Sequence, residues 1–252
     1  MSGVLSIVGL GPGSAAWMTP EAREAIERAD DLVGYAPYLD RLPERVGQRR
    51  HSSDNRVEIE RARHALELAA SGRNVAVVSG GDPGIFAMAA AVFEAVEHND
   101  AWRALDIRVM PGVSAMQAAA ARLGAPLGHD FCAISLSDNL KPWAIVERRL
   151  IAAAEGDFVI ALYNPASKTR PDRIRDAFAL LGARKAAATP VAFARAVGRE
   201  DERIHVTTLG AADVSVVDMS TLVLIGSSET RLVARADGRN WMLTPRGYGG
   251  GR

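Results

Sequence analysis

Cysteine is almost absent from this sequence of 252 residues, and long hydrophobic runs are missing altogether. Cys132 is the single cysteine, so no disulfide can form within the chain, which is typical of proteins from reducing compartments. No apolar stretch reaches the roughly 18 residues that indicate a membrane span, and the first residues lack the basic segment of a signal peptide. We therefore expect a cytoplasmic protein with no membrane partner.

An excess of charge of one sign is also missing, because 30 lysines and arginines balance 30 aspartates and glutamates. A protein that coats nucleic acid would carry a positive excess, so we expect no nucleic-acid partner. The five histidines are scattered and only one thiol is present, so we expect no metal site. The expected ligand is a small molecule, and an anionic one would need a local basic patch.

Short apolar runs alternate with segments of helical periodicity from the N-terminus to about residue 110. Thr19 is a favourable N-cap for a helix that begins at Pro20. This alternation predicts a mostly parallel sheet with helices on both faces. The other predicted elements of this region are the strands Val4–Val8, Asp31–Gly34, Val75–Val78 and Ile107–Met110 and the helices Val57–Ala70 and Ile85–Val96.

A Pro-Gly pair at residues 111 and 112 interrupts this pattern, and the apolar runs that follow are less regularly spaced. We predict two α/β domains, residues 1–112 and 113–252, with mixed strand directions in the second and a turn of helix within residues 211–217. The other predicted elements of the second domain are the helices Ser114–Leu123, Pro142–Ala154 and Pro171–Leu181 and the strands Phe131–Leu136, Phe158–Tyr163, Val191–Ala194, Ile204–Thr208 and Thr221–Ile225.

The first strand runs into a glycine-rich loop, Gly9-Leu-Gly-Pro-Gly13, with Asp30 and Asp31 about 20 residues later. This pattern is similar to a dinucleotide fingerprint and leaves a nicotinamide-dependent oxidoreductase open as an alternative. Its spacing is G-x-G-x-G rather than G-x-G-x-x-G, and Pro12 removes an amide that would hold a pyrophosphate. The small residues instead favour the close approach of another molecule to the end of the strand.

Four further loops follow predicted strands, at the edge where open α/β sheets bind their ligands. They are Ser79-Gly-Gly-Asp-Pro-Gly-Ile85, Pro111-Gly-Val-Ser-Ala115, Leu162-Tyr-Asn-Pro165 and Thr189-Pro-Val-Ala192. Five such loops in this order resemble the tetrapyrrole methylase family, and the resemblance runs from Val4 to about Ile225. It implies two α/β domains with S-adenosyl-L-methionine in the cleft between them, release of S-adenosyl-L-homocysteine, and a homodimer.

The resemblance also implies which residues bind the methyl donor. They are Pro12, Gly80, Gly81, Asp82, Ile85, Ser114 and Ala115 in the first domain and Tyr163, Asn164, Ala192, Ala194, Thr221 and Leu222 in the second. Other roles remain open for some of them, because Asp82 and Ser114 can each cap a helix and Tyr163 can be a core aromatic. The free amides of a helix that begins after Ser114 would also suit the carboxylate of the donor.

Residues 114–131, 135–143 and 163–168 are similar to the subgroup of the family that methylates a precorrin and contracts its ring. The resemblance implies a reduced tetrapyrrole on the route to vitamin B12, whose carboxylate arms require local positive charge. The residues expected to bind it are Arg49, Arg50, Ser135, Lys141 and Lys168. The basic cluster of residues 41–56, which includes Arg41, can equally be a solvated loop. A different precorrin, or one that carries cobalt, remains an alternative substrate.

Methyl transfer from a sulfonium needs alignment and the exclusion of water more than acid–base chemistry. This agrees with a sequence that shows neither a catalytic triad nor a metal cluster. Contraction of the ring needs a proton acceptor in addition. Asp138 and Ser137, in the polar segment that follows the predicted strand Phe131–Leu136, are the candidates for this catalytic step.

Overall fold

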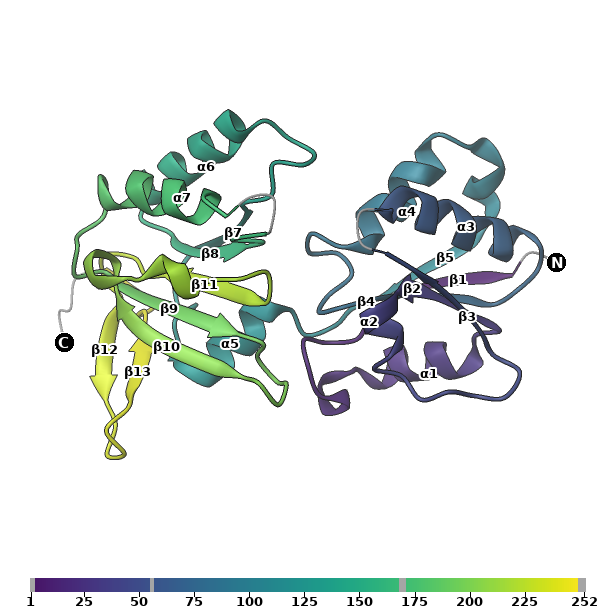
Figure 1. Cartoon of the computed structure of the whole chain (residues 1–252), viewed down its shortest axis with the longest axis horizontal. Coiled ribbons are helices and arrows are strands. Elements are labelled where there is room, and N and C mark those ends of the chain that lie inside the picture. The colour runs from purple at the N-terminus through teal and green to yellow at the C-terminus, as the bar shows by residue number, and fades with distance from the viewer. Residues whose placement is uncertain (1–2, 55–56, 168–170, 249–252) are drawn as a thin grey trace. The chain divides into compact units, whose positions relative to one another are not determined.

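The structure is a computed structural model that describes residues 3–54, 57–167 and 171–248. The chain divides into two compact units, Met1–Ala115 and Met116–Arg252, whereas the sequence prediction places the boundary after residue 112. We call them the N-terminal unit and the C-terminal unit and describe each by itself (Figure 1). None of the helices in the described ranges is long and apolar enough to cross a membrane.

One sheet of five strands forms the centre of the N-terminal unit. Its strands are β1 (Val4–Gly9), β2 (Asp31–Tyr35), β3 (Arg49–Ser53), β4 (Val75–Ser79) and β5 (Asp106–Met110). Their order is β3-β2-β4-β1-β5, and all four pairings are parallel, which confirms the predicted parallel sheet. Because all the strands run in one direction, their carboxyl ends share one edge of the sheet.

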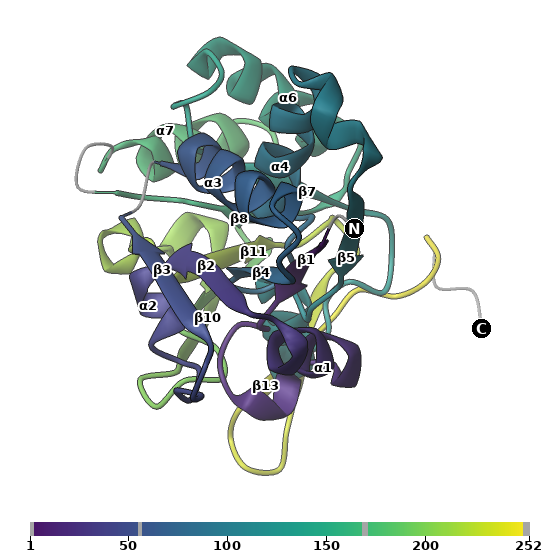
Figure 2. The ribbon, with the colours of Figure 1, turned by 90° about the vertical axis from the view of Figure 1, so that its right-hand side faces the viewer.

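Helices cover both faces of this sheet, as predicted. They are α1 (Pro20–Arg28), α2 (Ala36–Leu39), α3 (Glu58–Ala70) and α4 (Met88–Glu97), with short 3-10 turns at Ala15–Trp17 and Asp100–Ala104. Ile7 and Val77 pack with α3 and α4, whereas Val8 and Val78 pack with α1 and α2. Figure 2 shows α3 and α4 on one side of the strands and α1 on the other. The hydroxyl of Thr19 accepts a hydrogen bond from a first-turn amide of α1, which confirms the predicted cap.

Two segments of the N-terminal unit differ from the prediction. Residues 49–53 form the edge strand β3, paired with β2 from Asp31↔Arg49 to Tyr35↔Ser53, so the interpretation of this segment as a solvated loop is wrong. An edge strand is partly exposed, and β3 therefore lacks the apolar run by which the other strands are recognised. Helix α4 begins three residues later than predicted, because residues 82–86 form a turn that ends in a left-handed residue, Phe86 (φ 52°).

The main sheet of the C-terminal unit has mixed strand directions, as predicted. Its strands are β7 (Phe131–Ser135), β8 (Val159–Tyr163), β9 (Pro190–Arg195), β10 (Arg203–Thr208) and β11 (Thr221–Ile225). Their order is β10-β9-β11-β8-β7. β7 and β8 are parallel, and β11 is antiparallel to both β8 and β9. Strands β7, β8 and β9 therefore point the same way, and their carboxyl ends share one edge.

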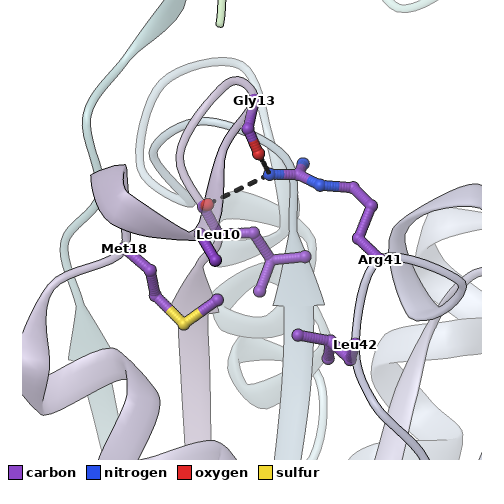
Figure 3. Close-up of a pocket in the computed structure, with 6 residues that line it drawn as sticks. Leu10, Gly13, Met18, Arg41 and Leu42 are labelled. Atoms are coloured by element: carbon purple, nitrogen blue, oxygen red, sulfur yellow. Dashed lines mark hydrogen bonds between the residues drawn. The ribbon is translucent and has the colours of Figure 1, made fainter. Parts of the chain in front are cut away.

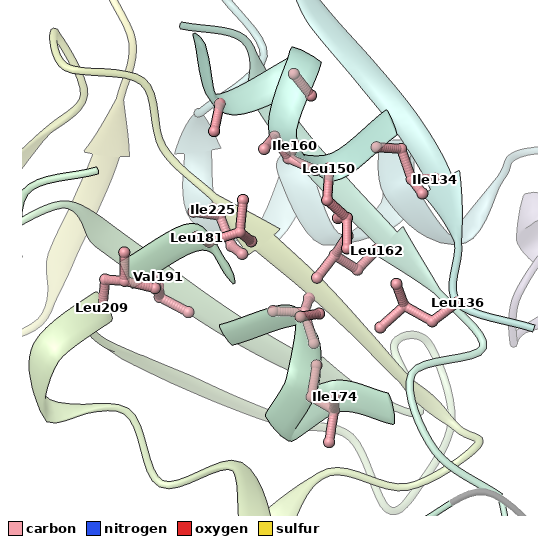
Figure 4. Packing of buried hydrophobic residues seen from close by; sticks show 14 of the residues in the cluster. Ile134, Leu136, Leu150, Ile160, Leu162, Ile174, Leu181, Val191, Leu209 and Ile225 are labelled. Atoms are coloured by element: carbon pink, nitrogen blue, oxygen red, sulfur yellow. The ribbon is translucent and has the colours of Figure 1, made fainter. Parts of the chain in front are cut away.

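The helices of this region are α5 (Ala115–Leu123), α6 (Trp143–Glu155) and α7 (Arg173–Gly182). α6 and α7 pack on one face of the main sheet, in a cluster that includes Leu150, Ile160 and Leu181 (Figure 4). Val191 and Phe193 of β9 belong to this cluster, so the residues that alternate with them point to the other face. A single 3-10 turn at Val214–Val216 lies within residues 211–217, where the sequence predicts a turn of helix, and another at Leu209–Ala211 ends at the first of these residues.

A second, smaller sheet in the C-terminal unit is not predicted from the sequence. Its strands are β6 (Gly124–Ala125), β12 (Arg231–Ala234) and β13 (Asn240–Leu243), in the order β12-β13-β6. All four residues of β12 are exposed, so the strand shows no alternation of buried and exposed side chains. The guanidinium of Arg235 lies 4.0 Å from the ring centroid of Trp241. This cation–π contact stabilises the hairpin of β12 and β13 at its surface.

Candidate functional site

Three loops that contain glycine meet at the carboxyl edge of the N-terminal sheet, after β1, β4 and β5. Two of them exchange hydrogen bonds, because Gly11 N donates to Gly81 O (3.1 Å) and Gly81 N donates to Gly11 O (3.0 Å). Both glycines have a φ of 69°, a backbone conformation that other residues rarely adopt. The pairing joins the loop that contains Pro12 to the loop that contains Gly80.

Close backbone contact holds the loop after β5, which contains Gly112, against the loops after β1 and β4. A Cβ on Gly112 would lie 2.3 Å from Gly81 O, and a Cβ on Gly9 would lie 2.8 Å from Gly112 N. A Cβ on Gly80 would lie 2.7 Å from the ring of Tyr38. At Gly9 and Gly112 the contacts are to backbone atoms, so a larger residue would displace the chain itself. The loops form one surface only because these positions are glycine.

Asp82 ties two of these loops together. Its Oδ1 accepts a hydrogen bond from Gly84 N (2.8 Å) in its own turn, and its Oδ2 accepts one from Gly112 N (3.0 Å) after β5. Helix α4 begins at Met88 with Ala87 as its N-cap, so the alternative that Asp82 caps this helix is wrong. A carboxylate has lone pairs beyond these two bonds, and contact of Asp82 with a donor stays a prediction.

Arg41 holds the first loop in place. Its Nη2 lies 3.1 Å from the carbonyl oxygen of Leu10, 3.1 Å from that of Gly11 and 2.7 Å from that of Gly13. Figure 3 shows the guanidinium reaching the loop beside a cavity of about 200 Å³, which Leu10, Gly13 and Arg41 help to line. Arg41 is therefore a positioning residue for this loop rather than a cation of a solvated loop.

If this loop belongs to the donor site that the resemblance implies, replacing Arg41 by glutamine should weaken the binding of S-adenosyl-L-homocysteine about fivefold, because a charge-assisted donor to the loop is lost, at a cost of about 1 kcal/mol. Isothermal titration calorimetry measures this change. Arg45→Gln is the matched control, since the Arg45 side chain pairs with Glu27 at the surface, at 3.3 Å, and not with this loop. Equal affinities in the two variants would show that Arg41 does not hold the loop in its binding conformation.

The other predicted donor residues of this unit lie on the same loops. Ser114 is 1 % exposed and directly precedes α5, which begins at Ala115. Pro12 and Ile85 are half-buried. The structure therefore brings the seven predicted residues of the N-terminal unit to three neighbouring loops at one edge of the sheet.

Tyr163 and Asn164 lie where β8 ends in the C-terminal unit. The hydroxyl of Tyr163 accepts a hydrogen bond from Met116 N (3.1 Å), an amide in the first turn of α5. Asn164 Nδ2 donates to Ser135 Oγ (3.0 Å), which also accepts a hydrogen bond from Ser137 N (3.3 Å). Four residues predicted from the sequence thus lie together at the carboxyl ends of β7 and β8.

Four residues other than glycine in the described part of the chain have left-handed backbone, and one of them, Asp157 (φ 54°), lies before β8. Phe86, Asn164 and Ala196 have φ values of 52°, 51° and 50°. These three follow the carboxyl ends of β4, β8 and β9 in that order, whereas Asp157 lies at the opposite edge. Such conformations cost about 1–3 kcal/mol each and cluster at ligand sites, where the surrounding structure holds them. Three of the four strained positions therefore lie at the edge that carries the predicted site loops of the two units.

Asp138 is bound by Arg173 of α7. Arg173 Nε and Nη2 lie 2.8 and 2.7 Å from Asp138 Oδ2, and Nη1 lies 3.2 Å from Oδ2 of Asp176. The hydrogen bond with Asp138 raises the pKa of Arg173, and its guanidinium packs 4.6 Å from the ring centroid of Trp143. The cation of Arg173 therefore lies directly against the carboxylate of Asp138 and fixes its position.

The residues predicted to pack near the adenine are buried. Ala192, Ala194 and Leu222 are 0 %, 1 % and 4 % exposed. Thr221 Oγ1 donates to Asp218 Oδ1 (2.8 Å), so its hydroxyl closes the turn before β11. These side chains present little free surface, and their contact with a donor stays a prediction.

The polar residues predicted to bind substrate have unlike surroundings. Arg49 is exposed on β3, and Lys141 is half-buried before α6. Arg50 donates to the carbonyl oxygens of Leu39 (3.1 Å) and Leu42 (2.8 Å), a supporting role at the end of α2 that the sequence does not predict. Lys168 lies outside the described residues.

The sequence did not predict that Arg41 and Arg173 position other residues of the site. Their only sequence signal is a charged residue near a strand or helix end, which does not identify a partner about 30 residues away. Within residues 3–54, 57–167 and 171–248, no group of three or more histidine, cysteine or acidic side chains is placed to hold a metal ion.

Known proteins provide a comparison for this geometry. The family model described as Tetrapyrrole (Corrin/Porphyrin) Methylases matches residues 4–213 of the chain. The precorrin-3B C(17)-methyltransferase of a Sinorhizobium species is 57 % identical over 251 residues, which cover 99 % of each chain. The probable cobalt-factor III C(17)-methyltransferase of Salmonella typhimurium is 46 % identical over 246 residues, which cover 97 % of this chain and 99 % of that protein.

Solved structures agree with the predicted α/β fold. A crystal structure of the methyltransferase CobJ is similar with a TM-score of 0.93 and 50 % identity, over 97 % of this chain and 100 % of that one. The uroporphyrin-III C-methyltransferase of Thermus thermophilus, solved in complex with S-adenosyl homocysteine, has a TM-score of 0.65 and 21 % identity over 89 % of this chain and 92 % of that one. The latter likeness shows a common fold alone.

Proposed function

This chain belongs to the tetrapyrrole methylase family, and on that premise we propose that it transfers a methyl group from S-adenosyl-L-methionine to C17 of precorrin-3B in cobalamin biosynthesis. The observation that carries the proposal is the 57 % identity to a precorrin-3B C(17)-methyltransferase over 99 % of both chains. Contraction of the macrocycle, with expulsion of its C20 bridge carbon from the ring to give precorrin-4, is part of the proposed reaction.

The donor is proposed to contact loops of both units. In the N-terminal unit, the turn of Gly80, Gly81 and Asp82 offers backbone amides and a carboxylate, and α5 begins directly after Ser114. Backbone amides at a helix start suit the carboxylate of the methionine moiety. In the C-terminal unit, the proposed contacts are Tyr163 and Asn164, which are held by α5 and by β7.

Methyl transfer is an in-line displacement. The electron pair of the enamine-like C17 forms the new bond to the methyl carbon, and the methyl–sulfur bond breaks with its electrons left on sulfur. The protein has to align the three atoms and exclude water, and such positioning lowers a barrier by about 7–11 kcal/mol. Rigid glycine loops suit this task, because their backbone contacts leave the donor surface little freedom to move.

Ring contraction needs a group that accepts the proton of a substrate hydroxyl while the ring carbon migrates. We propose Asp138 for this role, with Ser137 beside it. Arg173 fixes the direction of the carboxylate, through two nitrogens within 2.8 Å of one oxygen. Arg173 itself is a positioning residue in this mechanism.

A cobalt-bearing substrate is the second candidate, because a probable cobalt-factor III C(17)-methyltransferase is 46 % identical over nearly the whole chain. The metal would then belong to the substrate and would need no protein ligands. Parallel turnover assays with metal-free precorrin-3B and its cobalt complex distinguish the two candidates. We also propose that the protein acts as a cytoplasmic homodimer, and light scattering of the purified protein tests the dimer.

Binding of S-adenosyl-L-homocysteine tests the donor assignment. The wild type should bind it at about micromolar strength, and Asp82→Ala should weaken binding about tenfold, because the bond that holds the Gly112 loop is lost. Asp106→Ala is the control, since among the described residues the Asp106 carboxylate pairs with Arg108 alone, at the surface. NADH serves as the competing ligand. Tight binding of NADH together with no binding of S-adenosyl-L-homocysteine would favour the oxidoreductase alternative instead.

A further inference from the structure

A short segment after β2 contacts two of the three glycine loops in the N-terminal unit. It comprises α2 and the turns that follow it, residues 36–42, and we call it the support segment. Successive backbone hydrogen bonds join its residues, and they run from Asp40 N to Ala36 O (3.0 Å), from Arg41 N to Tyr38 O (3.3 Å) and from Leu42 N to Leu39 O (3.0 Å). The support segment is therefore one continuous coil of backbone.

Arg41 and Tyr38 make the contacts with the two loops. Arg41 Nη2 reaches three carbonyl oxygens of the loop after β1, beside the cavity in Figure 3. Tyr38 lies against the loop after β4, where a Cβ on Gly80 would lie 2.7 Å from Cζ of the Tyr38 ring and 2.8 Å from its Cε1. Tyr35, the last residue of β2, packs edge-on against the same ring, with centroids 5.4 Å apart. One segment therefore touches both of the loops that the paired glycines join.

Arg50 of β3 anchors the C-terminal end of the support segment. Arg50 pairs with Leu32 of β2, which belongs to the apolar cluster under α1 and α2, so the side chain of Arg50 points to that face of the sheet. Its Nη1 donates to Leu39 O (3.1 Å) and its Nη2 to Leu42 O (2.8 Å). Carbonyl oxygens at the end of a helical coil need donors and favour a nearby cation, and Arg50 provides both.

Helix propensity alone does not keep the support segment in place. An isolated helix shorter than about 12 residues is marginal in water, and α2 has four residues. Leu39 and Leu42 are 2 % and 8 % exposed, and their burial holds the segment on the sheet. Apolar burial has no direction, whereas the two hydrogen bonds from Arg50 require defined distances and angles. Arg50 therefore sets where the segment lies along the sheet.

We propose that Arg50 is a positioning residue for the methyl-donor loops, and that it acts through the support segment rather than as a cation for the tetrapyrrole. The proposal rests on the donor site proposed above. Loss of the Arg50 guanidinium releases the end of the segment, and Arg41 and Tyr38 then lose their fixed positions against the loops. The loops after β1 and β4 open locally, while the sheet below them stays folded.

Amide hydrogen exchange tests the positioning without any ligand. Arg50→Met keeps a long side chain but removes both donors, so amides in the loops of residues 10–13 and 80–84 should exchange about tenfold faster. Arg103→Met is the matched control in the same unit, since Arg103 Nη2 donates to the carbonyl oxygen of Glu97 at the end of α4, at 3.2 Å. It should leave both loops unchanged. Wild-type exchange in Arg50→Met, or faster exchange in one loop alone, would overturn the proposal.

Steady-state kinetics separates positioning of the donor loops from binding of the tetrapyrrole. Arg50→Met should raise the KM for S-adenosyl-L-methionine about fivefold and leave the KM for the tetrapyrrole within about twofold of the wild type. The reverse pattern would identify Arg50 as a substrate cation and overturn the proposal. Arg50→Lys keeps a charged donor that can reach one carbonyl oxygen, so it should restore most of the affinity for the donor.

A double-mutant cycle tests whether Arg50 acts through the support segment. Arg41→Gln and Arg50→Met should each weaken the binding of S-adenosyl-L-homocysteine about fivefold. If both disturb the same segment, the double variant should bind no more than about tenfold more weakly than the wild type. A loss of about 25-fold, the product of two independent effects, would exclude this route and overturn the proposal.

Two further measurements keep these results unambiguous. Thermal unfolding checks that each variant is folded, and Arg50→Gln replaces Arg50→Met if the latter is not, because glutamine keeps one donor. Arg50→Gln should show the same pattern of loop exchange with a smaller increase. A wild type that does not bind S-adenosyl-L-homocysteine would count against the proposed function alone, since the exchange experiment reports on the loops without a donor.

Discussion

Replacing Gly112 by alanine is expected to weaken the binding of S-adenosyl-L-homocysteine about 100-fold or more, a loss of about 2.7 kcal/mol. The added Cβ would lie 2.3 Å from Gly81 O and 3.0 Å from Gly9 Cα, and both are backbone atoms. Neither atom can turn aside as a flexible side chain would. The loop after β5 must therefore move away from the other two loops, and the bond between Gly112 N and Asp82 is lost with it.

Gly182→Ala is the matched control for this prediction. A Cβ at Gly182, the last residue of α7, meets nothing within 4 Å, so this variant should bind like the wild type. Circular dichroism and thermal unfolding of both variants separate a local shift of the loop from global unfolding. A Gly112→Ala protein that binds with wild-type affinity would exclude the three loops as the donor surface.

The centre of the parallel sheet of the N-terminal unit could be predicted because its inner strands β1, β2 and β4 are buried on both faces. β4, for example, consists of five buried residues, and the first four, Val75–Val78, form one apolar run. The start of α1 could be predicted because Thr19 and Pro20 have local preferences that do not depend on the rest of the fold. β3 and β12 lie at sheet edges with exposed residues, so neither carries such a run.

The loops of the site were recognisable as loops, but their mutual contacts were not. Glycine at positions 9, 81 and 112 indicates freedom of the backbone, whereas the contact of Gly112 with Gly81 depends on the order of β4, β1 and β5 in the sheet. The pairing of Asp138 with Arg173 likewise joins residues 35 positions apart. Side-chain partners of this kind depend on tertiary packing, which periodicity and turn chemistry do not encode.

Replacing Asp138 by asparagine is expected to slow ring contraction about 100-fold or more and to change methyl transfer by less than about threefold. Asparagine keeps the shape of the side chain but cannot take up the hydroxyl proton, whereas alignment of donor and C17 does not require a base. The variant should therefore accumulate a methylated tetrapyrrole that is not contracted. Quenched single-turnover reactions with isotopically labelled donor, read by mass and by absorption spectrum, measure both steps.

Asp176→Asn separates the chemistry of Asp138 from its ion pair, because both carboxylates contact the same guanidinium. Asp176 lies 3.2 Å from Arg173 Nη1, with its side chain 45 % exposed, whereas that of Asp138 is 17 % exposed. If loss of charge around Arg173 were the cause, both variants should slow contraction alike. If Asp138 accepts the proton, Asp176→Asn should contract the ring at nearly the wild-type rate. Contracted product at that rate from Asp138→Asn would mean that the carboxylate only anchors Arg173.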